Sequence, residues 1–360
     1  MKYSEFSLKG MAMLAAIMTA TVVIGCQTAK DNRIKADNPE INYMGRIYWN
    51  EDGEGEFTFP GTTAMLRFKG TGIGMEASPG SGKFMVEIDG ADPVAVNFTP
   101  SDSLLTLAEN LKDTIHDVRI TYALEGYELK PRFRGFVIDG KLLPAASRPD
   151  LKIEFIGNSI TCGYGIEDDN PDHDFSYNTE NHTMTYAYKT ARALDADFNV
   201  VARSGIGIYR NYGGAREGDT QTMPLEYDYT MLYNHDHEWD HSKFHPEIIC
   251  INLGTNDTSL DNYDIALYEQ RYRDFLSHLR DIHPKAKIVL LTGAMLQDQA
   301  LADVKTALDR LASEDSQVYR FDMSPQTGEL GYGASWHPSA RQAERMADEL
   351  IPFLRELTGK

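Results

Sequence analysis

The sequence predicts a two-domain α/β protein, in which an antiparallel, jelly-roll-like β-sandwich precedes a three-layer α/β/α domain with a parallel sheet. Three observations predict this fold class. The chain has 360 residues, which is enough for two domains. Short β-type runs separated by turn residues fill residues 42–143. From residue 151 onward, apolar strands alternate with helical patterns, which is the order of a βαβ fold.

The composition excludes several classes of protein. Hydrophobic residues make up 42% of the chain and charged residues 25%, which is typical of a globular protein and excludes disorder and collagen-like fibres. The net charge of −19, without a local basic patch, argues against a nucleic-acid partner. The chain has one apolar run of notable length, so a multi-span membrane protein is excluded as well.

The N-terminus has the features of an export signal. Lys2 and Lys9 precede MAMLAAIMTATVVIG, a stretch shorter than the roughly 20 residues of a spanning helix. It ends at Gly25-Cys26, which resembles the bacterial lipoprotein box and implies lipidation of Cys26. We therefore expect a signal peptide over residues 1–25 and an exported, acidic lipoprotein at the cell envelope, periplasmic or surface-exposed. Its lipid would be its only contact with the membrane, although soluble secretion and an uncleaved anchor remain alternatives.

The first half of the mature chain is β-rich. The polar stretch after Cys26 predicts a tether over residues 26–41. Turns such as Asp52-Gly53 and Asp89-Gly90 then separate the runs RIYW, GEFTF, AMLRFKG, GKFMVEIDG, VAVNF, HDVRITYAL and RFRGFVIDG. These runs predict a β-sandwich over residues 42–143, and the proline-containing segment that follows predicts a linker over residues 144–150.

The second half, residues 151–360, predicts a parallel sheet covered by helices. Its strands are the apolar runs KIEFIG, FNVVARSG, EIICINLG, KIVLLTG and QVYRFDM. Helical patterns lie between them, near residues 183–194, 264–281 and 299–312, and a final helix is expected over residues 338–357. In such sheets the reactive groups lie at the carboxyl ends of the strands.

The ends of three predicted strands and the start of the last helix carry groups suited to acyl transfer. The first three strands lead into Ser159, Gly205 and Asn256, and His337 precedes a helix expected to begin at Pro338. A serine hydroxyl is a weak nucleophile until a base such as histidine takes its proton. The backbone N–H groups of Ser159 and Gly205 and the side-chain amide of Asn256 would stabilise the tetrahedral oxyanion.

These residues, with the motifs IEFIGNSITCGYG, SGIG, LGTND and WHPS, resemble the SGNH hydrolases, whose four named residues would fall on Ser159, Gly205, Asn256 and His337. Behind an N-terminal β-domain, they resemble carbohydrate esterase family 2 in particular. The resemblance covers nearly all of the mature chain. It implies a serine esterase that removes O-acetyl groups from hemicellulose, either acetylated xylan or glucomannan, with no metal or organic cofactor.

The chain departs from related hydrolases just before the histidine. They usually carry an aspartate two or three residues earlier, where this chain has Ser335 and Ala334. We expect a backbone carbonyl to orient His337 in a Ser-His dyad, with Asp322 and Glu329 as distant alternatives. The helix at Pro338 is expected to disfavour the charged imidazolium.

Other side chains have a role in binding or an ordinary structural explanation. Tyr209, Tyr212 and Trp336 are candidate stacking faces for a sugar ring, or loop anchors. The tract that carries His237, His241 and His245 has ligand-like spacing, but we expect a solvated loop and no metal site. Two buried free thiols are favoured over a disulfide for Cys162 and Cys250.

Two other functions remain open. One is an SGNH esterase with another acyl substrate, such as a sialate O-acetylesterase, a thioesterase or a lysophospholipase. The other is a carbohydrate-binding lipoprotein that has lost activity together with the acidic residue.

Overall fold

The structure is a computed structural model, and it describes residues 32–359. The predicted signal peptide, the lipidation site Cys26 and residues 26–31 of the predicted tether lie outside the described residues. Within the described part, no helix combines the length and the apolar character needed to cross a bilayer.

The first domain is built from antiparallel strands. Its strands are β1 (Arg33–Lys35), β2 (Asn42–Met44), β3 (Tyr48–Trp49), β4 (Gly55–Glu56), β5 (Thr63–Ala77), β6 (Gly82–Ile88), β7 (Val94–Phe98), β8 (Leu104–Ala108), β9 (Thr114–Tyr122) and β10 (Arg132–Leu143). The long strand β5 pairs with β2 and β10 on one edge and with β9 and β8 on the other, so hydrogen bonds connect all ten strands. Phenylalanine and aliphatic side chains fill the core of this domain.

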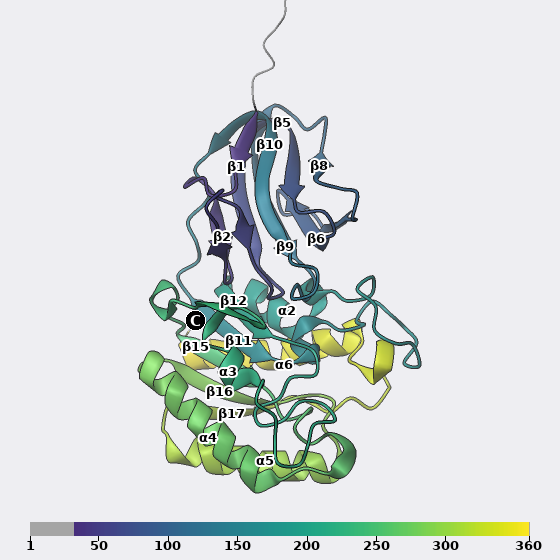
Figure 1. The fold of residues 1–360 in the computed structure, drawn as a ribbon, viewed down its shortest axis with the longest axis vertical. Helices are drawn as coiled ribbons and strands as arrows, with labels where there is room; N and C mark the ends of the chain where they lie inside the picture. Colours follow the sequence, from purple (N-terminus) through teal and green to yellow (C-terminus); the bar gives the residue numbers. More distant parts are fainter. Residues whose placement is uncertain (1–31, 360) are drawn as a thin grey trace, which may run out of the picture. The chain divides into compact units, whose positions relative to one another are not determined.

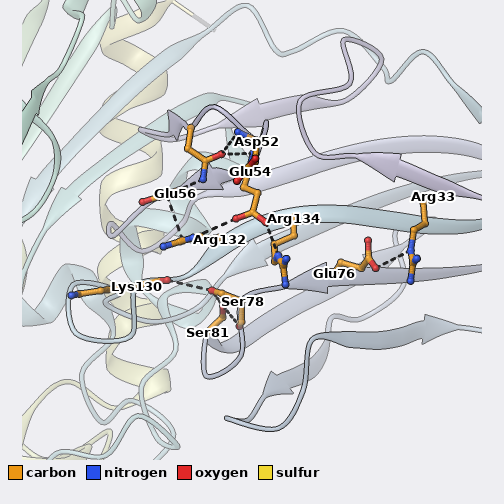
Figure 2. A network of polar contacts seen from close by, with 11 residues as sticks. Arg33, Asp52, Glu54, Glu56, Glu76, Ser78, Ser81, Lys130, Arg132 and Arg134 are labelled. Carbon is orange, nitrogen blue, oxygen red and sulfur yellow. Dashed lines mark hydrogen bonds and ion pairs between the residues drawn. The ribbon is translucent and has the colours of Figure 1, made fainter.

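The tether predicted over residues 26–41 is wrong in its second half. Residues Arg33–Lys35 form β1, which pairs with β10, and Ala36 and Ile41 are buried in the core of the β-domain. Arg33 also contacts Glu76 at 3.0 Å, next to the ion pairs that Glu54 makes with two arginines of β10 (Figure 2). The segment is polar in sequence because one short edge strand buries few side chains, so composition alone indicated a tether.

The second domain contains a five-stranded parallel sheet in the order β12-β11-β15-β16-β17. These strands are β11 (Lys152–Gly157), β12 (Asp197–Ala202), β15 (Ile248–Asn252), β16 (Lys287–Thr292) and β17 (Val318–Asp322). The other elements are α1 (Ser159–Cys162), α2 (Tyr186–Ala193), α3 (Met223–Glu226), α4 (Ile265–Ile282), α5 (Asp298–Glu314), α6 (Ala340–Thr358) and the hairpin of β13 (Tyr229–Met231) and β14 (Asn234–Glu238).

Helices cover both faces of this sheet, α4 and α5 on one face and α2 and α6 on the other (Figure 1). The alternation of strand β15 explains the two layers, because Ile249 and Ile251 pack on the α4 and α5 side whereas Ile248 and Cys250 pack on the other. An antiparallel β-domain followed by an α/β/α domain with a parallel sheet confirms the predicted fold class.

Arg46 connects the two domains. This fully buried arginine follows β2 and lies 3.3 Å from the carboxylate of Glu154 in β11. Its guanidinium also donates to the backbone carbonyls of Tyr227 and Tyr229 and lies over the Tyr227 ring. Since a buried charge is costly without a partner, this contact ties the β-domain to strand β11 of the parallel sheet.

Candidate active site

A cavity of about 610 Å³ lies at the carboxyl ends of the parallel strands and brings the four predicted residues together. Ser159, Gly205, Asn256 and His337 all line it. A second cavity of about 680 Å³, along β5 and β8, has no serine, cysteine or histidine among its lining residues. Of these two cavities, the first is the one equipped for nucleophilic chemistry.

Ser159 and His337 are in direct contact. The distance from the serine Oγ to Nε2 of the histidine is 2.8 Å, within the range for transfer of a proton to a general base. Nδ1 of His337 lies 3.1 Å from the carbonyl oxygens of both Ala334 and Ser335. Those carbonyls accept a hydrogen bond only from a protonated Nδ1, so Nε2 is left unprotonated and accepts the hydrogen bond from the serine hydroxyl.

An unusual turn makes this arrangement possible. Ser335 and Trp336 both have positive φ, 48° and 60°, and they form a tight loop before His337. The backbone N–H of His337 donates to the Ala334 carbonyl, and that of Ala334 donates to Gly165 beyond α1. Non-glycine residues adopt such backbone conformations at a cost, which is characteristic of functional loops. Here the strained loop brings two carbonyl groups to Nδ1.

Burial keeps the histidine neutral. Desolvation lowers the pKa of His337 to about 4, although the hydrogen bonds to the Ala334 and Ser335 carbonyls act in the opposite direction. The sequence predicts that a helix beginning at Pro338 disfavours the charged imidazolium, and this prediction is wrong. The helix begins at Ala340, with Ser339 as its N-cap accepting from the Gln342 backbone N–H. A serine N-cap satisfies an otherwise unpaired donor, whereas a proline at the same position would not.

The sequence around Ser159 fits a sharp exit from strand β11. A Cβ atom on Gly157 would lie 2.0 Å from the hydroxyl of Thr161, so only glycine fits there. The side chain of Asn158 accepts from the Ile160 backbone N–H and begins the short helix α1. The serine therefore sits at the first position of a turn that follows a buried strand.

Two further residues that line the cavity carry N–H donors. Gly205 has φ +80°, a conformation that favours glycine, and its carbonyl accepts from the backbone N–H of Tyr212. Asn256 donates one side-chain N–H to the Ile206 carbonyl at 2.7 Å, which leaves the second N–H for a ligand. Within residues 32–359, the backbone N–H groups of Ser159 and Gly205 donate to no protein acceptor. These unpaired N–H groups belong to residues that line one cavity, an arrangement that an oxyanion hole requires.

Asp257 holds this region rigid. The fully buried carboxylate accepts from the backbone N–H groups of Ile208 and Tyr209, both at 2.8 Å. Desolvation raises the pKa of Asp257 to about 6. Asp257 thus ties the loop that carries Asn256 to the loop that carries Gly205.

The three aromatic candidates lie in different surroundings. Tyr212 is 66% exposed and lines the cavity, so it is available for stacking. Tyr209 is buried, and its hydroxyl accepts from the Asp264 backbone N–H, so its prediction as a stacking face is wrong. Trp336 is exposed, but it packs against Tyr332 and is not among the residues that line the cavity.

Tyr164 is a site residue that the sequence did not reveal. Its ring stacks on the imidazole of His337, with the ring centroids 4.0 Å apart and an angle of 20° between the planes. It follows α1 in an irregular loop, where no periodicity predicts the direction of a side chain. Tyr164 and His337 lie near opposite ends of the sequence of the second domain, so only folding brings the two rings together.

The two carboxylates that could replace the missing aspartate, Asp322 and Glu329, form no hydrogen bond with His337. Asp322 pairs with Lys305 and Arg320, and Glu329 is exposed. Among the described residues, none of the hydrogen-bond partners of His337 is a carboxylate. The expected orientation by backbone carbonyls therefore agrees with the geometry.

Among the described residues, His237, His241 and His245 do not form a group whose ligand atoms lie within 4.8 Å of one another, although His241 and His245 both lie beside His283. His237 stacks on Tyr48, His241 contacts Asp228, and His245 lies beside His283. Cys162 and Cys250 are both free and buried, as predicted. One group of potential ligands does come together in the part of the chain that the structure describes, namely Glu125, Cys162 and Glu180.

Family models match both domains. Residues 43–145 match the model described as carbohydrate esterase 2 N-terminal, and residues 155–353 match the GDSL-like lipase/acylhydrolase family.

Curated proteins and solved structures are similar to nearly the whole chain. A cellulase/esterase, CelE, of Acetivibrio thermocellus is 34% identical over 335 residues, which is 90% of this chain but only 40% of that protein. An acetylxylan esterase/glucomannan deacetylase of Cellvibrio japonicus is 30% identical over 331 residues, 90% of each chain. A family two carbohydrate esterase from Clostridium thermocellum, solved with cellohexaose, superposes with a TM-score of 0.82 at 34% identity, covering 89% of this chain and 99% of the other.

Proposed function

Because the chain belongs to carbohydrate esterase family 2, a family of carboxylic ester hydrolases, we propose that it removes O-acetyl groups from acetylated xylan or glucomannan. The Cellvibrio japonicus relative, an acetylxylan esterase/glucomannan deacetylase, supports this class of substrate. The observation that carries the proposal is the contact of 2.8 Å between the Ser159 hydroxyl and Nε2 of His337, in a cavity that also contains Gly205 and Asn256.

The proposed reaction has two steps. The Ser159 Oγ attacks the acetyl carbonyl while His337 Nε2 takes its proton, and the tetrahedral oxyanion accepts from the N–H groups of Ser159, Gly205 and Asn256. The imidazolium then protonates the sugar oxygen as the C–O bond breaks, which leaves an acetyl group on the serine.

In the second step, water loses a proton to His337 and attacks the acetyl-enzyme. Collapse of the second intermediate returns the proton to Ser159 and releases acetate. Throughout the cycle, the carbonyls of Ala334 and Ser335 hold Nδ1–H in place, the role that a carboxylate has in a triad.

The direct test is release of acetate from acetylated xylan and acetylated glucomannan by the chain from Gln27 onward. We expect Ser159→Ala and His337→Ala to lower the rate by at least about 10³-fold. Ser259→Ala is a matched control, because it removes a serine hydroxyl from the same cavity without touching His337. Activity that persists in a chelator supports chemistry without a metal.

Other outcomes identify the alternatives. Binding of either polysaccharide without release of acetate, unchanged in Ser159→Ala, would indicate a carbohydrate-binding lipoprotein. Faster turnover of long-chain esters or thioesters would indicate another acyl substrate.

We further propose that the protein is exported and anchored by a lipid on Cys26. The Gly25-Cys26 junction after the apolar segment supports this anchor. Fractionation tests it. The native chain is expected in the membrane fraction, and Cys26→Ser is expected to lose the lipid. A native chain without lipid would refute the proposal.

A further inference from the structure

A buried carboxylate from the β-domain reaches the oxyanion site. Glu125 lies in the loop between β9 and β10 and is 3% exposed. One of its oxygens accepts from the backbone N–H of Ser204 and the other from the Ser204 hydroxyl, both at 2.5 Å. Ser204 directly precedes Gly205 and lines the same cavity. The front domain therefore contacts the catalytic domain next to one of the oxyanion donors.

Two other groups surround this carboxylate. Glu180 accepts from the backbone N–H of Glu125 at 3.2 Å, and the thiol of Cys162 completes a cluster whose ligand-type atoms all lie within 4.8 Å of one another. All three residues are buried. Oε1 of Glu180 has no donor among the described groups.

Burial favours the neutral forms of the two groups around Glu125. Desolvation and the neighbouring Glu125 raise the pKa of Glu180 well above its ordinary value. Burial also raises the pKa of the Cys162 thiol. Both shifts favour the neutral forms of the Glu180 carboxyl and the Cys162 thiol beside Glu125.

The position of Ser204 determines the direction of the next peptide group. The N–H of Gly205 lies in the same rigid plane as the Ser204 carbonyl. A carboxylate that holds both the backbone N–H and the hydroxyl of Ser204 restricts the rotation of that residue and, with it, the peptide plane that follows. On the other side, Tyr212 donates its backbone N–H to the Gly205 carbonyl and fixes the exit of the loop.

We propose that Glu125 is a positioning residue for the oxyanion hole, through which the β-domain orients the N–H of Gly205 toward the cavity. The proposal rests on the proposed function, because it assigns the orienting group for one of the three donors of that reaction. It also gives the front domain a role in turnover that is independent of any binding of glycan.

The test compares variants on 4-nitrophenyl acetate, a small ester that needs no contact with polysaccharide. Glu125→Ala is expected to lower kcat about 10- to 100-fold, part of what a whole oxyanion donor contributes, with KM changed less than about threefold. Glu125→Gln keeps the volume and one acceptor, so it is expected to recover much of the loss. Ser204→Ala, which keeps the backbone N–H, is expected to lie between Glu125→Ala and the native chain.

Lys83→Met is the matched control for a general loss of domain contact. Its ammonium crosses from β6 to the second domain, where it donates to Glu167 at 2.6 Å and to the Asn178 carbonyl at 2.9 Å. It touches neither Ser204 nor Gly205, so we expect a lower melting temperature but an unchanged kcat. Loss of this cation also favours the neutral form of Glu180.

A crystal structure of Glu125→Ala supplies a readout that does not depend on activity. The proposal expects the Ser204–Gly205 peptide to turn, so that the Gly205 N–H no longer faces the cavity. An unchanged peptide, or a kcat equal to that of Lys83→Met, would overturn the proposal even if the native chain is active. If the native chain is inactive, the proposed function fails while the peptide orientation still decides the role of Glu125.

The cluster could instead be a cation site, and metal analysis separates the two explanations. We expect the purified native chain to contain no stoichiometric zinc, because both oxygens of Glu125 already accept from Ser204. One equivalent of zinc that disappears in Glu180→Gln would assign the cluster to metal binding and overturn the proposal.

Discussion

The pH dependence of turnover follows from the environment of His337. Its Nε2 must be unprotonated to take the proton of Ser159, and desolvation lowers the pKa of His337 to about 4. At pH 5.5 about 97% of such a histidine is neutral, against about 9% of one with the ordinary pKa of about 6.5. We therefore expect kcat/KM at pH 5.5 to remain close to its value at pH 7.5.

The assay is kcat/KM for 4-nitrophenyl acetate between pH 3.5 and 8, since this parameter reports ionisation of the free enzyme. The activity should fall on the acid side with a midpoint near the pKa of His337, about 4. Acid also destabilises the fold, because the unfolded chain binds this proton more tightly, so stability is lost as the pH falls from about 6.5 toward 4. Circular dichroism at each pH separates unfolding from titration.

A midpoint between pH 6 and 7 in a chain that remains folded would refute the reasoning. It would indicate that a nearby negative charge stabilises the imidazolium, as in a complete triad. The two carbonyls that face Nδ1 would then be insufficient to describe the surroundings of the base.

Three further predictions concern the oxyanion site, the substrate and the fold. Asn256→Ala should lower kcat by about 10²- to 10³-fold with a small effect on KM, and a loss below threefold would exclude its role as a donor. Tyr212→Ala should raise KM for acetylated oligosaccharides but leave KM for 4-nitrophenyl acetate unchanged, whereas equal effects on both esters would argue against stacking on the sugar. Glu154→Gln should lower the free energy of unfolding by about 3 kcal/mol, because Arg46 would stay buried without its counter-ion, and urea denaturation with a change under 1 kcal/mol would contradict this.

Most of the second domain could be predicted because its signals are local. Each parallel strand is a nearly continuous apolar run, and parallel strands have their carboxyl ends at one edge, so Ser159, Gly205 and Asn256 were expected to meet. The structure brings them together with His337 around one cavity. Because Ala334 and Ser335 stand where related hydrolases carry an aspartate, the sequence also predicts that backbone carbonyls orient His337.

Other features depend on packing that no local pattern encodes. Strand β1 is polar and only three residues long, so its sequence predicts a tether and not a strand. Tyr209 follows Gly205 closely in sequence, but its side chain is buried and its hydroxyl accepts from the backbone N–H of Asp264. Glu125 lies 79 residues before Ser204 along the chain, in a different domain, and no motif links the two.

The most direct test of the central claim is to trap the acetyl-enzyme. A chain mixed with excess 4-nitrophenyl acetate and quenched in acid within milliseconds is analysed by intact mass and peptide mapping. The account predicts an added mass of about 42 Da on Ser159, absent in Ser159→Ala and slow to form in His337→Ala. Rapid release of acetate with no adduct on Ser159, or with an adduct on another residue, would contradict it.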